Sequence, residues 1–414
     1  MLRHASQDIS LYVHLPFCDT LCYFCGCTML VSNNRDRIAA YLDRLFTEIE
    51  LTSSLLPSRK VVQLHWGGGT PTQLLPDEIR ALGKKLQECF TITTTAEVSV
   101  EIDPRNITED HIRALSEVGF RRASIGVQDM DAGVQRAINR IQPEEVTRQV
   151  IEWCRKYGFD SINIDLIYGL PLQTTETYKT TLEKVLTFKP DRLALYNFAY
   201  VPWLKPHQKL ISIDDLPESD EKLALFTMAL DRFQEAGYEY IGMDHFALES
   251  DELVAASRKG TLQRNFQGYS TNAGCDLIGL GMSSISHIDG WFSQNEKVLD
   301  RYSTRILQNE LPSASGLEMS TDDRIREYII MRLMCDLTLD IEALERKFKI
   351  DFKDYFSTSI TLLEPLEEDG LVLVTSKAIS VTDTGRFFLR NIAMCFDAYL
   401  PNMQQGSPIF SKTQ

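Results

Sequence analysis

The chain has 414 residues, of which 43% are hydrophobic and 24% are charged, a balance typical of a folded globular protein. Its net charge of −15 argues against general affinity for nucleic acid or an anionic membrane surface, because both require clustered Lys and Arg. No apolar stretch is long enough to span a membrane and no secretory signal opens the sequence, so we expect a cytoplasmic protein, with a monomer as the default.

Short apolar segments alternate with helical patterns from residue 10 to about residue 245. The predicted strands are Leu11–His14, Val61–Trp66, Glu97–Ile102, Arg122–Val127, Ser161–Ile167, Arg192–Phe198 and Tyr238–Met243. The predicted helices between them include Ile38–Leu55, Asp110–Val118, Glu144–Tyr157 and Glu218–Gly237. Repeated strand–helix units with right-handed crossovers predict an α/β fold, and about six of them fit a partial (β/α)6 TIM-like barrel over residues 1–245.

Two further regions and a tail follow this predicted barrel. Residues 246–315 are rich in Gly, Ser and polar residues, which predicts active-site loops and a connecting region. Residues 316–400 are expected to form a smaller, mostly helical, winged-helix-like domain, whose acidic segment Asp351–Asp369 argues against DNA binding. Its predicted elements are helices over Thr321–Leu337, Ile341–Phe348, a segment through about Glu368 and Thr384–Tyr399, and a hairpin of Leu371–Val374 and Ala378–Val381. Residues 401–414 are predicted to be a tail.

Four of the nine cysteines, Cys18, Cys22, Cys25 and Cys27, lie within ten residues after the first predicted strand. A tight group in a long chain indicates a metal site rather than a disulfide framework. Three thiolates with the spacing C-x3-C-x2-C can hold three irons of a 4Fe–4S cluster and leave the fourth iron open to another ligand. Zinc is the weaker alternative, because it favours two separated ligand pairs or four closed ligands.

This spacing is the signature of radical S-adenosylmethionine (SAM) enzymes. The stretch YVHLPFC at residues 12–18, followed by CYFCGC at residues 22–27, resembles the oxygen-independent coproporphyrinogen III oxidase family. Chaperone-like and methyltransferase-like relatives usually have Phe or another residue in place of Cys27, so the C-x-C ending favours the oxidase family. The resemblance implies that Cys18, Cys22 and Cys25 bind the cluster, that Cys27 is required without being a ligand, that Tyr12 lies near the sulfonium of SAM, and that Phe24 packs on its adenine.

Further candidate SAM-binding residues follow later predicted strands. Gly68, Gly69 and Thr70 stand in a glycine-rich turn whose backbone groups can hold the amino group of SAM, although such a turn also occurs without a ligand. Polar residues at successive strand ends would form a ring on one barrel face, which a plain core would not tolerate. By resemblance, Glu101 contacts SAM, Gln128 and Asp165 hold its ribose hydroxyls, Arg140 pairs with its carboxylate, and Phe266, Gln267 and Ile285 lie near a second SAM.

The resemblance implies a specific reaction, oxidative decarboxylation of two propionates of coproporphyrinogen III to vinyl groups, giving protoporphyrinogen IX. A 5′-deoxyadenosyl radical would take a hydrogen from each propionate, so two SAM molecules are used, with an unidentified electron donor and acceptor. The family carries several tens of residues ahead of the first strand, whereas ten precede Leu11 here. We expect cluster and SAM binding to be independent of that segment. A tetrapyrrole-modifying methyltransferase and a heme chaperone-like protein are the alternatives on this scaffold.

Overall fold

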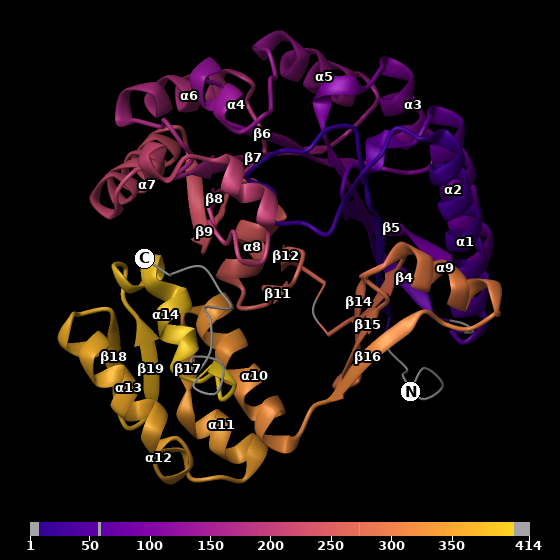
Figure 1. Ribbon diagram of the computed structural model, residues 1–414. Coiled ribbons are helices and arrows are strands. Elements are labelled where there is room, and N and C mark those ends of the chain that lie inside the picture. The colour runs from indigo at the N-terminus through magenta and orange to yellow at the C-terminus, as the bar shows by residue number, and fades with distance from the viewer. Residues whose placement is uncertain (1–7, 57–58, 273, 401–414) are drawn as a thin grey trace. The chain divides into compact units, whose positions relative to one another are not determined.

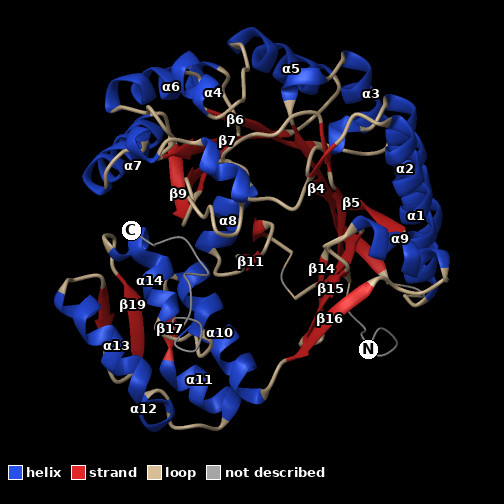
Figure 2. Cartoon of the chain, viewed as in Figure 1, coloured by secondary structure: helices blue, strands red, loops and turns tan. Residues whose placement is uncertain are grey.

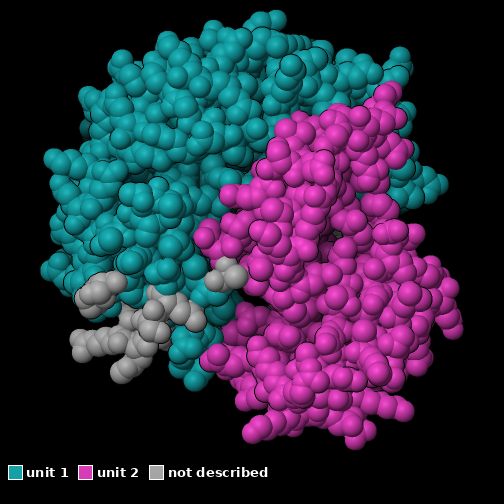
Figure 3. Space-filling view, turned by 180° about the vertical axis from the view of Figure 1, so that it is seen from behind, with its two compact units in different colours: residues 1–198, 207–229, 274–318 teal, residues 199–206, 230–273, 319–414 magenta. Residues whose placement is uncertain are grey.

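The computed structural model describes residues 8–56, 59–272 and 274–400, which fall into two compact units (Figure 3). Unit 1 combines residues 1–198, 207–229 and 274–318, and unit 2 combines residues 199–206, 230–273 and 319–414. The domain boundaries predicted at residues 245, 315 and 400 stay a prediction, because each of the two units combines three separate segments of the chain. Within the described residues, no helix is both long and apolar enough to cross a membrane.

Unit 1 is built on a sheet whose central strands are parallel, in the order β13-β1-β4-β5-β6-β7-β8. Figure 1 labels β4, β5, β6, β7 and β8 of this run. Their bounds are β1 (Ile9–Leu15), β4 (Lys60–Gly68), β5 (Thr91–Ile102), β6 (Arg122–Gln128), β7 (Ser161–Tyr168), β8 (Arg192–Asn197) and β13 (Asp276–Leu280). Beyond β13, the strands β14 (Ile285–Ile288), β15 (Trp291–Asn295) and β16 (Ser313–Glu318) continue the sheet antiparallel. The α/β prediction is confirmed, since each of the six strands predicted up to residue 198 is found.

Helices lie along the outer side of this parallel sheet (Figure 2). They are α1 (Arg35–Ser54), α2 (Pro76–Cys89), α3 (Glu109–Glu117), α4 (Ala132–Ala137), α5 (Glu144–Lys156), α6 (Thr175–Thr187), α7 (Ser219–Glu235) and α9 (Leu299–Leu307). The first of them shows why they form. Asn34 caps α1 by accepting from Arg37 N, and Ile38, Tyr41 and Leu45 are buried at helical spacing. All seven residues of β1 are buried, as expected for a parallel strand at the centre of a covered sheet.

Short elements complete unit 1 at the carboxyl ends of the strands. They are β2 (Phe17–Cys18), β3 (Leu30–Val31) and the 3-10 turns η1 (Pro71–Gln73), η2 (Pro104–Asn106) and η4 (Ile213–Asp215), while η3 (Pro206–Leu210) starts at the boundary with unit 2. Leu15 at the end of β1 lies opposite Gly68 at the end of β4. Because parallel strands point the same way, the segments that follow them meet at one edge of the sheet.

Unit 2 is mostly helical, as predicted, and carries short strands that pair antiparallel with one another. Its elements are β9 (Tyr238–Gly242), β10 (His245–Leu248), α8 (Glu252–Arg258), β11 (Gln263–Asn265), β12 (Gly268–Ser270), α10 (Thr321–Asp336), β17 (Thr338–Asp340), α11 (Ile341–Phe348), α12 (Phe352–Tyr355), α13 (Ser357–Glu368), β18 (Val372–Val374), β19 (Ala378–Val381), η5 (Gly385–Phe388) and α14 (Leu389–Met394). Its main core contains Ile329 of α10, Leu344 of α11 and Phe396, all fully buried. The predicted hairpin corresponds to β18 and β19, and β17 adds a third strand beside β19.

Two elements of unit 2 differ from the sequence prediction. The strand predicted over Tyr238–Met243 is β9, which pairs antiparallel with β10 across a short turn instead of joining the parallel run. A parallel pair would need a long crossover, and only Met243 and Asp244 separate β9 from β10. The helix predicted over Thr384–Tyr399 is a 3-10 turn and a short α-helix that ends at Met394. Beyond it the backbone hydrogen bonds join residues three apart, from Cys395 N to Ile392 O and from Phe396 N to Ala393 O.

Candidate functional site

The cysteine loop leaves β1 at Leu15 and lies against the glycine turn that follows β4. Gly69 N donates a hydrogen bond to Leu15 O over 2.9 Å. A Cβ at Gly69 would lie 2.5 Å from Pro16 O, and a Cβ at Gly68, whose φ is +115°, would lie 2.5 Å from the ring of His14. Glycine is therefore required at both positions for the two loops to pack together.

A pocket of about 310 Å³ opens at this edge of the sheet, and its lining belongs to unit 1. Twelve of the predicted site residues line it: Cys18, Cys22, Phe24, Cys25, Cys27, Gly68, Gly69, Thr70, Glu101, Gln128, Arg140 and Asp165. They come from five different parallel strands and the loops that follow them, as the predicted ring of strand-end residues requires. This volume lies at the small end of the range for ligand sites.

Each of the three predicted ligand sulfurs accepts a hydrogen bond from the protein. The donors are Thr70 Oγ1 to Cys18 Sγ (3.3 Å), Arg105 Nη2 and Arg140 Nη1 to Cys22 Sγ (3.5 and 3.6 Å), and Cys27 N to Cys25 Sγ (3.4 Å). Burial raises the pKa of the Cys18 thiol to about 12, and the Thr70 hydrogen bond only partly offsets this. The loop therefore holds this thiol protonated until a metal displaces the proton, while the donors suit thiolate sulfur.

The arrangement of these side chains also bears on the kind of metal. Among the residues that the structure describes, no three His, Cys, Asp or Glu side chains converge to hold a single metal ion. The three sulfurs nevertheless line one pocket, with a donor beside each. Their assignment as ligands to a larger iron–sulfur group therefore depends on that shared pocket, on the sulfur donors and on the spacing C-x3-C-x2-C.

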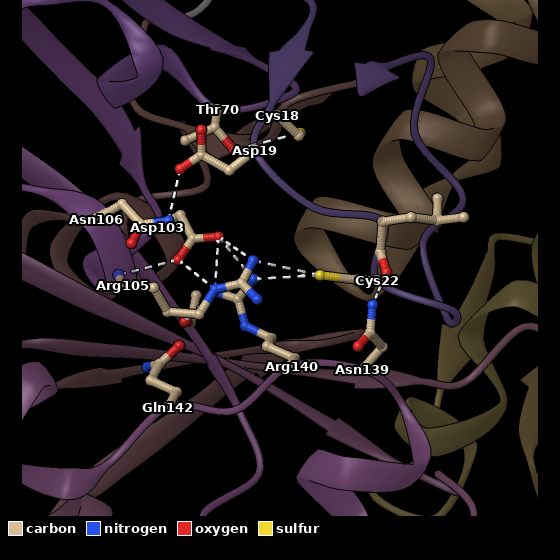
Figure 4. Close-up of polar contacts among 12 residues, drawn as sticks. Cys18, Asp19, Cys22, Thr70, Asp103, Arg105, Asn106, Asn139, Arg140 and Gln142 are labelled. Atoms are coloured by element: carbon tan, nitrogen blue, oxygen red, sulfur yellow. Dashed lines mark hydrogen bonds and ion pairs between the residues drawn. The ribbon is translucent and has the colours of Figure 1, made fainter. Parts of the chain in front are cut away.

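A compact charge cluster lies beside Cys22 (Figure 4). Asp103 accepts from Arg105 Nη2 (2.6 Å) and from Arg140 Nη1 (2.9 Å), and Arg140 Nη2 donates to Gly126 O (2.7 Å). Burial alone would raise the pKa of Asp103, but the charge of Arg140 and the bonds from Arg105 lower it to about 2. Two guanidinium groups around one carboxylate leave one positive charge uncompensated, and Arg140 Nε is buried without a hydrogen-bond partner. The cluster can therefore accept a further carboxylate.

Glu101 provides the opposite charge in the same pocket. Its Oε1 lies 3.3 Å from His65 Nε2, its Oε2 accepts from Gly68 N (3.1 Å), and His65 Nδ1 lies 2.7 Å from Ser99 Oγ. Loss of hydration tends to raise the pKa of Glu101, but the hydrogen bond and charge of His65 and the Gly68 N–H outweigh it, so the pKa is lowered. Glu101 is thus an anion at neutral pH and suits an ammonium group.

The predicted ribose-binding residues lie on β6 and β7. Asp165 accepts from Ser124 Oγ (3.0 Å) and Asn163 Nδ2 (2.7 Å), and burial raises its pKa to about 7 despite the Ser124 hydrogen bond. Gln128 ends β6 with φ of 68°, a left-handed conformation that is uncommon for a residue with a side chain. A Cβ on Gly126 would lie 2.8 Å from Gln128 Nε2, so the bare glycine leaves room for that amide. Both side chains offer polar groups to the pocket.

Tyr12 and Cys27 differ in their surroundings. The Tyr12 hydroxyl lies 3.0 Å from His14 Nδ1, and its ring stacks on His65 with a centroid separation of 5.9 Å. Burial raises the pKa of Tyr12 above its ordinary value, so it is a neutral phenol. Cys27 N donates to Cys25 Sγ over 3.4 Å, and a hydrogen bond between the Cys27 and Cys25 side chains, followed by burial, raises the pKa of the Cys27 thiol. Tyr12 does not line the pocket but contacts His65, the partner of Glu101, whereas Cys27 lines the pocket beside Cys25.

The residues predicted for a second SAM are not among those that line this pocket. Ile285 is the first residue of β14 in unit 1, whereas Phe266 and Gln267 lie between β11 and β12 in unit 2. Phe266 is 50% exposed, and Gln267 Nε2 is buried without a hydrogen-bond partner. Their assignment to a second SAM stays a prediction.

The structure adds residues that sequence reasoning missed. Asp103 and Arg105 form the charge cluster with Arg140, and His65 joins Glu101 to Tyr12. The signal for the first two was present, because Asp-Pro-Arg directly follows β5 at the strand end where predicted site residues gather. His65 carries no such signal, since it stands within a strand whose apolar pattern predicts only burial.

The chain is similar to known proteins over most of its length. A model of the radical SAM superfamily matches residues 12–185, and a model of the HemN C-terminal domain matches residues 319–388. Oxygen-independent coproporphyrinogen III oxidase of Salmonella typhimurium is 45% identical over 410 residues, which cover 98% of this chain and 90% of that protein. The Pseudomonas aeruginosa enzyme of the same name is 44% identical over 97% of this chain and 88% of its own length. The chain belongs to the oxygen-independent coproporphyrinogen III oxidase family.

A solved structure supports the same assignment within this family. Coproporphyrinogen III oxidase (HemN) from Escherichia coli, described as a radical SAM enzyme, matches with a TM-score of 0.93 and 44% identity. The match covers 96% of this chain and 92% of that one. The family recognition made from YVHLPFC and CYFCGC is therefore confirmed. The superfamily match contains all twelve predicted residues that line the pocket.

Proposed function

We propose that this chain catalyses oxygen-independent oxidative decarboxylation of two propionates of coproporphyrinogen III, giving protoporphyrinogen IX in porphyrin and heme biosynthesis. The observation that carries the proposal is the pocket that brings three cysteine sulfurs together with paired positive and negative groups. Near-full-length relatives named for this reaction support the choice of substrate.

Cys18, Cys22 and Cys25 would hold three irons of a 4Fe–4S cluster. The fit is chemical, because each sulfur already has a hydrogen-bond donor and two of those donors are guanidinium groups. Positive charge and N–H donors beside sulfur stabilise thiolate ligands. When bound, the cluster and SAM together supply one-electron radical chemistry.

The protein's own groups match the polar parts of one SAM molecule. The free N–H of Arg140 and the net positive charge around Asp103 would bind its carboxylate. Glu101, held ionised by His65, would bind its ammonium together with backbone groups of Gly68, Gly69 and Thr70. Asp165 and Gln128 would hold the ribose hydroxyls, while Phe24 would pack on the adenine.

Tyr12 and Cys27 would act on the reacting end of the pocket. Tyr12 stays neutral and is fixed between the two imidazoles of His14 and His65, so it can shield a sulfonium without adding charge. Cys27 would be required without binding iron, because Cys18, Cys22 and Cys25 already complete the ligand set of three sulfurs. Phe266, Gln267 and Ile285 would bind a second SAM, and we propose a cytoplasmic monomer that depends on an unidentified electron donor and acceptor.

The decisive experiment is an anaerobic assay of the reconstituted protein with coproporphyrinogen III, SAM and a reductant. Protoporphyrinogen IX and 5′-deoxyadenosine are the expected products, and Cys27→Ser should retain its iron but lose decarboxylation. Methylated tetrapyrrole with S-adenosylhomocysteine would instead indicate a methyltransferase. Stoichiometric heme binding without SAM cleavage would indicate a chaperone-like protein, and either result would overturn the proposal.

A further inference from the structure

Two side chains from the 3-10 turn η3 contact the cysteine loop from a distant part of the sequence. His207 Nε2 lies 2.8 Å from Cys25 O, and Gln208 Nε2 donates to Phe24 O over 3.0 Å. His207, Gln208 and the loop all belong to unit 1. Because a carbonyl oxygen only accepts, the Nε2 atom of His207 must carry the hydrogen. Two successive side chains therefore bind two successive carbonyl groups.

The position of these contacts within the loop gives them their importance. The earlier part of the loop is anchored by other residues, since Tyr23 N donates to Ile138 O (3.0 Å) and Asn139 Nδ2 donates to Leu21 O (2.8 Å). The later part begins at Phe24 and Cys25 and leads into the exposed residues Gly26 and Cys27. The side chains from η3 thus hold the loop where it turns toward solvent.

Burial indicates that the contact is built into the fold. Gln208 is fully buried, although the next residue, Lys209, is exposed. Burying an amide costs free energy unless it makes hydrogen bonds, and Phe24 O supplies one of them. A buried Gln is therefore retained beside a loop carbonyl, where an apolar residue would leave that carbonyl without its donor.

We propose that His207 and Gln208 are positioning residues. Their hydrogen bonds hold the backbone of Cys25, the third cluster ligand, and of Phe24, the residue that packs on adenine, in a single conformation. The inference rests on the proposed assignment of Cys25 to the cluster and of Phe24 to SAM. The donors on His207 and Gln208 set the direction of the Cys25 and Phe24 peptide groups, and hence where the Cys25 sulfur and the Phe24 ring point. Outer partners of this kind commonly change metal affinity or activity by about 10- to 100-fold when removed.

The test compares variants in cluster lifetime and SAM affinity, without coproporphyrinogen. His207→Leu and Gln208→Leu should each assemble a cluster that decays about tenfold faster in air, followed by its charge-transfer absorbance, and should bind SAM about tenfold more weakly. His207→Gln keeps an N–H donor and should recover most of the wild-type lifetime. Lys209→Ala on the same turn is the matched control and should match wild type.

The proposal would be overturned if both leucine variants had the same cluster lifetime and SAM affinity as wild type and Lys209→Ala. If a leucine variant fails to fold, the comparison of His207→Gln with Gln208→Glu tests the proposal instead. Gln208→Glu removes the hydrogen-bond donor at nearly constant shape and should shorten the cluster lifetime. His207→Gln keeps a donor and should not shorten it. Equal lifetimes for that pair would also overturn it. A wild-type protein that holds its cluster but decarboxylates no propionate would refute the proposed function and leave this inference standing.

Discussion

Glu48 is a buried carboxyl group whose replacement tests the structure quantitatively. It lies on α1, is 1% exposed, and accepts from Tyr302 Oη (2.6 Å), Gly281 N (2.8 Å) and Asn295 Nδ2 (2.7 Å). Burial raises its pKa from 4.5 to about 7, and the hydrogen bonds offset only part of that effect. The folded protein therefore binds the Glu48 proton more tightly than the unfolded chain does.

The sign of the pH dependence follows from this raised pKa. The stabilising effect of the Glu48 proton is complete below 4.5 and is lost as pH rises through about 7. The change is worth roughly 3 kcal/mol in total, of which roughly 2.5 kcal/mol falls between about pH 5 and about pH 8. Glu48→Gln removes this dependence, but its amide group has to face one of the three donors and loses that hydrogen bond, at a cost of about 1–2 kcal/mol.

The two terms predict that the order of stability reverses with pH. Near pH 5 the Glu48→Gln protein should unfold at a lower temperature than wild type, because only the lost hydrogen bond counts. Near pH 8 the variant should be at least as stable, since its stability relative to wild type rises by roughly 2.5 kcal/mol, or roughly 3–5 °C in melting temperature for a unit of this size. Thermal unfolding of the metal-free protein at both pH values measures the difference. A variant that melts below wild type by the same interval at both pH values would refute the reasoning.

Three other substitutions test the site and unit 2. Cys22→Ala should abolish the cluster absorbance, because it removes one sulfur from the predicted ligand set; unchanged iron content would disprove the assignment. In wild type, SAM affinity should rise roughly fivefold as pH increases through about 7, since only the ionised Asp165 carboxylate is a strong acceptor, and Asp165→Asn should remove this rise. Calorimetry measures the SAM affinity of both proteins across that pH range, and the same pH dependence in both would contradict the prediction. Gly385→Ala should destabilise unit 2 by about 3 kcal/mol, because its Cβ would lie 1.9 Å from Leu371 O. Gly316→Ala, whose Cβ would lie 3.4 Å from Phe292 O, is the control and should change the melting temperature little.

The sequence predicted much of this molecule because its signals are local. The parallel strands are short buried runs, and the cysteine and glycine motifs directly follow two of them, so the pocket could be anticipated from order along the chain. The E. coli structure and the family matches confirm the α/β fold and the family that these motifs predicted. Periodicity alone could not show that β9 turns back on β10, because the pattern of a strand is the same in a parallel and an antiparallel pair.

The missed site residues show a different limit. Arg140 carried an expected role, but its ion pair with Asp103, which also binds Arg105, depends on two loops that meet only after the sheet forms. His207 reaches Cys25 across 182 residues, and nothing near either position in the sequence announces the contact. Long-range pairs of this kind become visible only in the folded structure.

The close fit between Gly68, Gly69 and the cysteine loop has a consequence for protein design. No side chain can be added to either glycine without displacing His14 or Pro16, so the two motifs form a single structural unit. Grafting the cysteines alone onto another barrel would leave them without the matching surface that shapes their loop. A designer who wishes to move this centre would have to transplant both strand ends together.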